Sequence, residues 1–454
     1  MVWSVEPSND TLLASRTNYH FTLHCTLQKS KSCVLRPAPY TSFPTKESIG
    51  TRIGEDPKFT FFRMGLFYKK TWITLFLILV FTVGFQVWLS MNATRELSFR
   101  VLMKSMLGNK NNYINKENAV CPKVISSDYD MSLFQYKRLS KSEPPIDAVF
   151  LYVNSSDPIF IQELSKYTDE PDMSRYRDIG QLKYGMRSIF MYAPWIRTIY
   201  VVVSNRQTQT PQWLNTSSEL VEVIEHKEIW PYNVEDTLPS FNSHAMEWSL
   251  LNIPNVSELI YFFNDDFSLL NPIDPQEHIF GKDGGQILYE GKEATRFFGK
   301  TARTKSLAFT RRLFDRKIGF KISRRKGLHV PWLMNITVMK MMYSHFESDI
   351  RQMYEDGPFR SDHDLQTMFA YQQYIRSIST EVNVNVCNNR LIFKGLIDGK
   401  NYNNRIYRNV TESKNETLFL CLNDAFDNPS DDVINDAVKF YDELYPIKAP
   451  WELA

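Results

Sequence analysis

The chain has 454 residues, a formal net charge of +2, and a content of 43% apolar and 14% aromatic residues. This length suffices for two or three domains, or for one large domain with appendages. The apolar fraction is ordinary for a globular protein and excludes a chain that is disordered throughout, and the near-neutral charge gives no indication of a nucleic-acid partner.

A membrane anchor is the first predicted element. Residues 1–70 are polar and without periodicity, which indicates a disordered cytosolic tail, although Met64 could be the true start. Residues 71–91 carry no charge and are long enough to cross a bilayer, with Trp72 and Trp88 placed as interfacial anchors. The apolar run is too long for a cleaved signal peptide, so we predict a single transmembrane helix of type II topology.

Sequons and cysteines agree with a lumenal location of the remaining chain. Asn-x-Ser/Thr occurs after the span at Asn92, Asn154, Asn215, Asn255, Asn335, Asn409 and Asn415, and before it only at Asn9. Three cysteines follow the span. We predict a disulfide between Cys387 and Cys421, which leaves Cys121 to link a possible homodimer.

The folded domain is predicted to follow a stem at 92–143 and to occupy 144–454. Short apolar runs that predict buried strands alternate with amphipathic segments that predict helices. The strands are expected at 146–153, 199–203, 220–224 and 259–263, and the helices at 178–193, 242–251, 347–376 with a break at Gly357-Pro358, and 427–445. Alternation of this kind predicts an α/β fold with a parallel sheet.

The run from Leu259 to Phe263 leads directly into Asn264-Asp265-Asp266. Ligands of open α/β sheets bind at the carboxyl ends of the strands, where these polar side chains are expected. Carboxylate oxygens suit Mg²⁺ or Mn²⁺ in a site for a phosphorylated substrate. The alternative is a turn in which the aspartates only cap the next segment.

A basic segment at 292–326 contains 13 Lys or Arg residues and two acidic residues, Glu293 and Asp315. Two interpretations remain open at this point. The segment is either a solvated, partly helical insertion or a basic wall that faces a diphosphate or an anionic acceptor.

Four ordered blocks of sequence resemble the Stealth family of hexose-1-phosphate transferases, which includes bacterial capsule polymerases and the catalytic subunit of GlcNAc-1-phosphotransferase. Together the blocks span nearly all of residues 145–453. The first runs from Ile146-Asp147 to Asp157-Pro158, the second from Arg177-Asp178 to Asn264-Asp265-Asp266, the third from His329-Val330-Pro331 through Phe359-Arg360-Ser361 to Asp364, and the fourth from Asn423-Asp424 to Trp451-Glu452.

The resemblance implies a nucleotide-sugar-binding fold of the glycosyltransferase A type with helical additions. It also implies transfer of a sugar-1-phosphate from a nucleotide-sugar, such as UDP-GlcNAc, to a hydroxyl of a glycan or glycoprotein, with release of a nucleoside monophosphate. Mg²⁺ or Mn²⁺ is the expected cofactor, and with the predicted anchor the expected location is the Golgi membrane.

The resemblance also implies roles for individual residues. Asp265 and Asp266 are expected to hold the metal ion, with Asp266 ranked first. His329 is expected to act as acid or base because an ordinary histidine has a pKa near working pH. Arg360 is the expected phosphate clamp, and Glu247 a base or metal partner.

These roles have plain structural alternatives. His329 could be a structural histidine beside Pro331, Arg360 could pair with Asp362 or Asp364 on the surface, and Glu247 could be an exposed helix residue. Nucleotide contacts are expected from Asn154, Asp157, Arg187, Asn205, Asn242 and Asn264. Because Asn154 would lie in the nucleotide turn, its sequon is expected to be unglycosylated.

Two other functions are compatible with the sequence. An ordinary glycosyltransferase on a similar fold would transfer the sugar itself and release a nucleoside diphosphate. A lumenal binding module would retain the fold without catalysis, against which the intact Asp266, His329 and Arg360 argue.

Overall fold

The computed structural model describes residues 116–125, 145–281, 284–295, 298–318, 324–378, 381–387 and 389–453. These residues belong to one unit, Trp88–Ala454. The predicted tail, the predicted anchor at 71–91 and the predicted stem, apart from 116–125, lie outside the described residues. Within the described ranges, no helix has the length and apolar character needed to cross a membrane.

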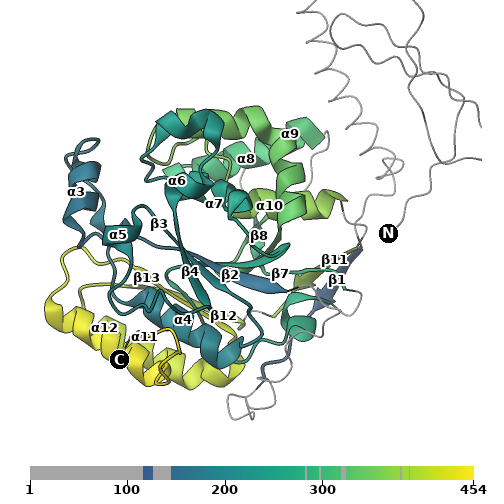
Figure 1. The fold of residues 1–454 in the computed structure, drawn as a ribbon. Coiled ribbons are helices and arrows are strands. Elements are labelled where there is room, and N and C mark those ends of the chain that lie inside the picture. The colour runs from purple at the N-terminus through teal and green to yellow at the C-terminus, as the bar shows by residue number, and fades with distance from the viewer. Residues whose placement is uncertain are drawn as a thin grey trace, which may run out of the picture. The chain divides into compact units, whose positions relative to one another are not determined.

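A five-stranded sheet with the order β10-β5-β2-β3-β4 forms the centre of the fold (Figure 1). Its strands are β2 (Ile146–Leu151), β3 (Ile199–Val203), β4 (Val221–Glu225), β5 (Leu259–Asn264) and β10 (Trp332–Asn335). The first four are parallel and β10 is antiparallel to β5. The predicted parallel α/β sheet is therefore confirmed.

The strand order reverses between β2 and β5. After β2 the chain adds β3 and β4 on one side, and it then returns to add β5 on the other side. A crevice opens where connections leave a parallel sheet in opposite directions, and ligands bind there. Leu151 of β2 pairs with Asn264 of β5, so Tyr152 and Asp265 emerge side by side at this crevice.

Two hydrophobic clusters cover the two faces of this sheet, because successive strand residues point to opposite sides. Phe150 and Phe263 stack at 4.8 Å in one cluster, and Val149 and Phe262 belong to the other. Figure 1 shows α4, α11 and α12 on the first face and α7, α8, α9 and α10 on the second.

The helices follow from apolar spacing and from their end signals. In α4, buried Leu182, Met186 and Ile189 recur at helical intervals and face the sheet. In α12, acidic residues occupy the first turn, where they are favourable for the helix dipole, and the helix ends shortly before Pro446.

The α-helices are α3 (Pro158–Ser165), α4 (Gln181–Tyr192), α5 (Arg206–Gln209), α6 (His226–Ile229), α7 (Ser243–Ser249), α8 (Ala302–Ile318), α9 (Ile336–Glu355), α10 (Thr367–Ile378), α11 (Lys400–Ser413) and α12 (Asp431–Leu444). Short irregular helices are η1 (Met173–Arg175), η2 (Tyr232–Thr237), η3 (Leu250–Asn252), η4 (Pro275–Ile279) and η5 (Lys414–Glu416). The predicted helices are confirmed, including the break between α9 and α10. The first of that pair begins earlier than predicted, at Ile336, where the Asn335 side chain caps it by accepting from the Val338 N–H.

Smaller sheets complete the fold. Their strands are β6 (Phe267–Leu269), β12 (Leu391–Leu396) and β13 (Phe419–Asp424) in the order β12-β13-β6; β1 (Lys116–Val120), β7 (Ile287–Leu288) and β11 (Glu381–Asn385) in the order β1-β11-β7; and the pair β8 (Glu290–Ala294) and β9 (Arg325–Gly327). Cys421 of β13 pairs with Phe267 of β6, the residue after Asp266. The C-terminal sequence block therefore lies directly beside the predicted metal residues.

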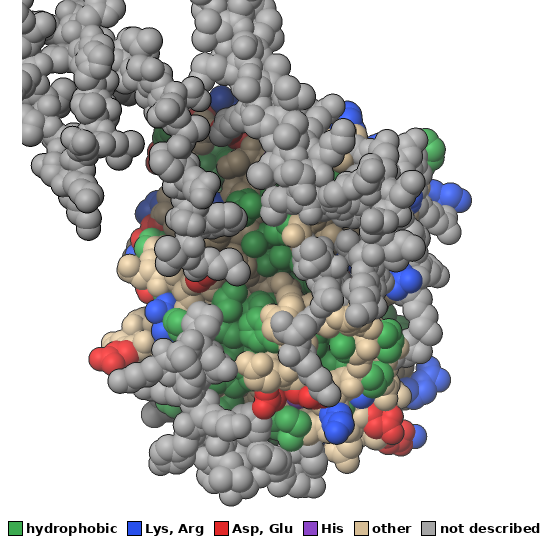
Figure 2. Space-filling model, turned by 90° about the vertical axis from the view of Figure 1, so that its right-hand side faces the viewer, with side chains coloured by type: hydrophobic (Ala, Val, Ile, Leu, Met, Phe, Trp, Pro, Cys, Tyr) green, Lys and Arg blue, Asp and Glu red, His purple; other side chains and the backbone are tan. Residues whose placement is uncertain are grey.

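The face of the molecule that Figure 2 turns toward the viewer shows apolar side chains between the residues that are not described. Lys or Arg and Asp or Glu side chains both appear around them. Among the side chains visible there, the two signs of charge are mixed.

A disulfide joins Cys121 to Cys387, with their Cα atoms 5.4 Å apart. Both the predicted Cys387–Cys421 bridge and the predicted Cys121-linked homodimer are therefore wrong. The reason is the parallel pairing of β1 with β11, which places Val120 opposite Asn385 and brings the cysteines that follow them together. Cys421 is a free, buried thiol on β13.

Peptide mapping without reduction should recover a Cys121–Cys387 linked peptide. Cys121→Ser should lower the free energy of unfolding by about 2–4 kcal/mol, because the bridge restricts the unfolded chain. Cys387→Ser should have the same effect, and the double variant should be no less stable than either single variant. A disulfide-linked dimer of the wild type that disappears in Cys121→Ser would overturn this pairing.

Candidate active site

A cleft of about 780 Å³ opens at the carboxyl ends of β2, β3 and β5. Its lining comes from distant parts of the chain: the segments after the strands, η1, α7, α8, β9, the start of β10 and the end of β13. Its volume is within the range of ordinary small-molecule sites.

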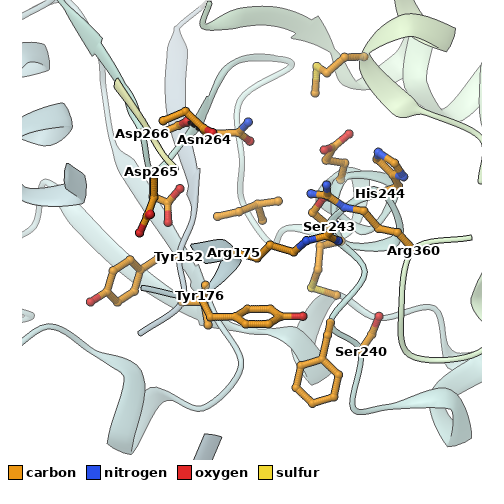
Figure 3. A pocket seen from close by; sticks show the side chains of 18 of the residues that line it. Tyr152, Arg175, Tyr176, Ser240, Ser243, His244, Asn264, Asp265, Asp266 and Arg360 are labelled. Carbon is orange, nitrogen blue, oxygen red and sulfur yellow. Dashed lines mark hydrogen bonds between the residues drawn. The ribbon is translucent and has the colours of Figure 1, made fainter. Parts of the chain in front are cut away.

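One wall of the cleft carries the carboxylates that follow β5. Asp266 Oδ2 accepts hydrogen bonds from Cys421 Sγ at 3.1 Å and from Asn423 Nδ2 at 3.2 Å, both on β13. Its other oxygen, Oδ1, is inaccessible to solvent and has no hydrogen-bond partner among the described residues. Figure 3 shows Asp265 and Asp266 together on one side of the cleft.

Burial raises the pKa of both carboxyl groups. The pKa of Asp265 lies well above its ordinary value, because the negative charges of Asp266 and Asp178 add to the effect of burial. The pKa of Asp266 is also raised by burial, although its bonds to Cys421 and Asn423 act in the opposite direction. The charge of Arg303 also lowers the Asp266 pKa, so a cation near the pair favours its ionised form.

A third carboxylate lies near this pair and is held by the end of β2. The Tyr152 hydroxyl donates to Asp178 Oδ2 at 2.6 Å, and Asp178 Oδ1 accepts from the Gly180 N–H at 2.7 Å. Asp178 thereby fixes the turn that leads into α4, and Tyr152 lines the cleft beside Asp265.

Asp265 and Asp266 could supply two of the oxygen ligands of a hard divalent cation, but not a complete ligand set. The described portion of the chain contains no group of three or more His, Cys, Asp or Glu arranged to hold a metal ion. Mg²⁺, however, commonly takes one or two protein carboxylates and completes its shell with water and phosphate. Asp265 with the orphaned Oδ1 of Asp266 supplies such a pair.

Cationic side chains face these carboxylates. Arg175, Arg177, Arg303, Lys326 and Arg360 all line the cleft. Arg175 pairs with Asp172 at 2.9 Å and Arg177 with Asp424 at 2.8 Å. In the described part of the chain, the other three have no carboxylate partner, so their charges are available to an anion.

Arg360 is directed into the cleft by α7. Its Nε donates to Ser243 Oγ at 3.1 Å, and its Nη2 donates to the same oxygen. The surface pairing considered as an alternative is absent, because Asp362 pairs with Lys305 and Asp364 with His244. Burial lowers the Arg360 pKa, and Figure 3 shows its guanidinium on the side opposite Asp265.

Glu247 lies on α7, lines the cleft and is only 7% exposed. The interpretation of this residue as an exposed helix glutamate is therefore wrong. Burial raises its pKa, while the positive charges of His244 and Arg360 oppose the rise.

His329 lines the cleft just before β10. Its ring stacks on Phe393, with centroids 4.5 Å apart, and its Nε2 accepts from the Arg303 guanidinium. Burial, together with the charges of Arg303, Lys326 and Arg360, lowers the His329 pKa to about 4. The expectation of a pKa near working pH is thus wrong, and the imidazole is neutral at pH 7.

Three predicted nucleotide residues do line the cleft. Asp157 caps α3 through Oδ1 and also accepts from the Thr208 hydroxyl at 2.7 Å. Asn205 caps α5, and Asn264 ends β5. All three follow or end strands of the central sheet.

Three other predicted nucleotide residues have structural roles outside the cleft lining. Arg187 is buried on α4 and binds Glu452 at 2.7 and 2.8 Å. The Asn154 side chain accepts from the Ser156 N–H at 2.7 Å, and Asn242 caps α7 while donating to Asp364 at 3.0 Å. None of the three lines the cleft.

Each interpretation of the basic segment at 292–326 holds for some of its residues. Arg303 and Lys326 line the cleft, which agrees with a basic wall. Others are in ion pairs elsewhere: Arg324 with Asp315, Lys317 with Asp349 and Lys305 with Asp362.

Sequence reasoning missed several residues of the cleft, namely Tyr152, Arg175, Ser243, Arg303, Lys326 and Asn423, and it also missed Cys421, which binds Asp266. The excess of positive charge was the available signal for Arg303 and Lys326. Nothing in the spacing of the chain indicated that Cys421 contacts Asp266, 155 residues away.

Comparison with known proteins identifies three of the four blocks. Conserved region 2 of the Stealth proteins matches residues 175–287, region 3 matches 328–377 and region 4 matches 413–454. The chain belongs to the Stealth family. All three Stealth regions contribute to the cleft, through Asp265 and Asp266, through His329 and Arg360, and through Asn423 and Asp424.

Several bacterial Stealth relatives are similar over most of the domain. An exopolysaccharide phosphotransferase of Streptomyces coelicolor is 30% identical over 68% of this chain and 51% of its own length. A capsular polysaccharide phosphotransferase of Haemophilus influenzae is 27% identical over 70% of this chain and 93% of its own length. The chain thus matches about half the length of the Streptomyces protein.

Among solved structures, the galactosyltransferase LgtC with donor and acceptor sugar analogues aligns over 66% of this chain and 95% of that chain, with 12% identity and a TM-score of 0.32. Mouse xyloside xylosyltransferase 1 aligns over 62% of this chain and 98% of that chain, with 11% identity and a TM-score of 0.31. Scores at this level do not establish a common fold.

Arg187→Ala should destabilise the Stealth domain strongly, because it leaves Glu452 buried without its partner. Removing one member of a buried ion pair costs about 3–5 kcal/mol, which a urea titration would detect. Arg351→Ala is the matched control, since it removes an exposed arginine paired with Glu355 and should change the midpoint little. If Arg187→Ala keeps normal stability but loses nucleotide binding, the structural role is wrong and the predicted nucleotide contact of Arg187 is supported.

The depressed His329 pKa predicts a stability that depends on pH. Unfolded histidine binds a proton below pH 6.5, whereas folded His329 rejects it until about pH 4. This contribution to folding is therefore complete above pH 6.5 and is lost as the pH falls toward 4. The urea midpoint should fall more between pH 7.5 and pH 5 in the wild type than in His329→Gln. Equal falls in the two proteins would contradict the lowered pKa.

Proposed function

We propose that this Stealth protein transfers a sugar-1-phosphate from a nucleotide-sugar to a hydroxyl of a glycan or glycoprotein acceptor, releasing a nucleoside monophosphate. The observation that carries the proposal is that Asp265 and Asp266 share one cleft at the sheet crevice with the cations Arg303 and Arg360. The names of the relatives as polysaccharide phosphotransferases support the same reaction class.

Binding of the diphosphate is the main task of the residues. Phosphoryl transfer requires in-line positioning and charge stabilisation more than covalent participation by the protein. Arg360 would contact phosphate oxygens with the guanidinium edge that Ser243 leaves free, and Arg303 would do so from α8. Mg²⁺ or Mn²⁺ held by Asp265 and Asp266 would add positive charge at the same phosphates.

The nucleoside would occupy the part of the cleft nearest β2 and β3. Asp157 and Asn205 line that part and are held in place by their capping bonds, and Asn264 follows on β5. Hydrogen bonds from such fixed polar groups are suited to recognition of a ribose or base.

His329 would take the proton of the acceptor hydroxyl. The acceptor oxygen forms a bond to the β-phosphorus, the bond to the nucleoside monophosphate oxygen breaks, and the proton passes to Nε2 of the imidazole. This nitrogen becomes free to accept the proton when the Arg303 guanidinium turns from it to the phosphates. A neutral imidazole is the form that can accept it. Binding of the diphosphate offsets the charges of Arg303 and Arg360 that lower the His329 pKa, so the ring becomes more basic when the donor is bound. Glu247 is the second candidate for this role.

The cellular setting is part of the proposal. We infer a Golgi membrane protein anchored by residues 71–91, on the basis of the uncharged apolar run and of the sequons that follow it. Glycosylation at Asn215 and Asn409 would support a lumenal domain.

The released nucleotide tests the reaction. The purified protein should be incubated with UDP-GlcNAc, UDP-glucose and GDP-mannose and an acceptor glycan, and the nucleotide product identified by chromatography. A nucleoside monophosphate is expected; a nucleoside diphosphate would show transfer of the sugar alone and would overturn the proposal.

Asp266→Asn should reduce transfer by at least about 10²-fold, because it removes a carboxylate charge next to the phosphates. Its thermal midpoint should be unchanged or higher, since a buried charge beside Asp265 is removed. Asp362→Asn, which changes an aspartate outside the cleft, should retain activity. Full activity of Asp266→Asn, or of the wild type in a chelator, would remove the metal role.

A further inference from the structure

Phe393 is an exposed aromatic residue that contacts the cleft without belonging to the core. It lies on β12, the edge strand of the sheet β12-β13-β6, where its neighbour Ile392 is buried. The Phe393 side chain is 43% exposed. Its ring is nearly parallel to that of His329, at 28° and a centroid distance of 4.5 Å.

The order of the strands sets the order of the polar groups along the cleft, from β3 at one end to β10 at the other. Along the sheet, Asn205 follows β3, Asp157 follows β2, the aspartate pair follows β5, and His329 precedes the antiparallel β10. Neighbouring strands are about 4.8 Å apart, so these groups occupy successive positions along one edge. If the nucleoside binds near β3 and β2, the acceptor must approach from beyond β5.

His329 and Phe393 lie at that far end. The contact between them joins the proposed base to a flat apolar surface that is open to solvent. The C–H face of a pyranose packs well on an aromatic ring, which offers a large rigid surface at low entropic cost. The imidazole covers one face of the Phe393 ring, so a sugar that packs across the exposed edge of Phe393 would reach His329 with one hydroxyl.

We propose that Phe393, together with His329, forms the acceptor subsite, which binds the pyranose ring whose hydroxyl attacks the donor. This inference rests on the proposed function and extends it by assigning the place and chemical class of the acceptor. Phe393 positions the ring, and His329 meets the hydroxyl.

The decisive comparison is Phe393→Leu with Phe393→Tyr in the full chain. Leucine keeps an apolar side chain against His329 but removes the flat ring, whereas tyrosine restores the ring. Phe393→Leu should raise the acceptor KM roughly three- to tenfold, with the donor KM unchanged. Phe393→Tyr should match the wild type.

Tyr232→Ala is the matched control, because Tyr232 is 90% exposed on η2 and lies outside the cleft lining. It should leave every constant unchanged. Equal acceptor KM values for Phe393→Leu and the wild type, or an equal rise in Tyr232→Ala, would overturn the subsite.

A binding measurement separates failure of the subsite from failure of the reaction. Methyl glucoside, methyl galactoside and methyl mannoside, each at millimolar concentration, serve as probes in saturation-transfer NMR with the wild type and both variants. Transfer to at least one probe that is lost in Phe393→Leu and kept in Phe393→Tyr supports the subsite even if no nucleoside monophosphate is ever released. Signals that are absent, or equal in all three proteins, overturn it.

Discussion

Two carboxylates are buried side by side at the end of β5, and the surrounding structure has to offset the cost of burying them. Burial raises the pKa values of Asp265 and Asp266, and the charge of Asp266 raises that of Asp265 further, so the pair is unfavourable unless donors or positive charges lie near it. Cys421 and Asn423 satisfy one oxygen of Asp266. The other oxygen has no hydrogen-bond partner among the described residues, and Arg303 and Arg360 line the same cleft.

The fold holds this arrangement by long-range contacts. β13 reaches Asp266 from more than 150 residues away in the sequence, and Asp424 at its end holds Arg177 at the rim of the cleft. The buried bond of Arg187 to Glu452 fixes the final segment against α4. Both sides of the cleft are thus supported by parts of the chain that pack firmly, which preorganises the charges.

The sequence was informative where local physics decides the outcome. Apolar runs such as 199–203 are buried on both faces and could only be strands, and polar residues at their ends had to lie at one edge. It failed where a partner comes from far away. The long-range partner of Arg187, the pairing of Cys121 and the cations that lower the His329 pKa are all properties of packing, and no local spacing encodes them.

The position of β13 has a consequence for biosynthesis. A ribosome makes the chain from its N-terminus, and the strands β2 to β5 emerge long before Cys421, Asn423 and Glu452. Until then Asp266 lacks its two hydrogen-bond donors and Arg187 lacks its buried partner. A nascent chain halted before β13 therefore contains the carboxylates but no assembled cleft, and quality control in the cell meets an incomplete domain until translation is almost finished.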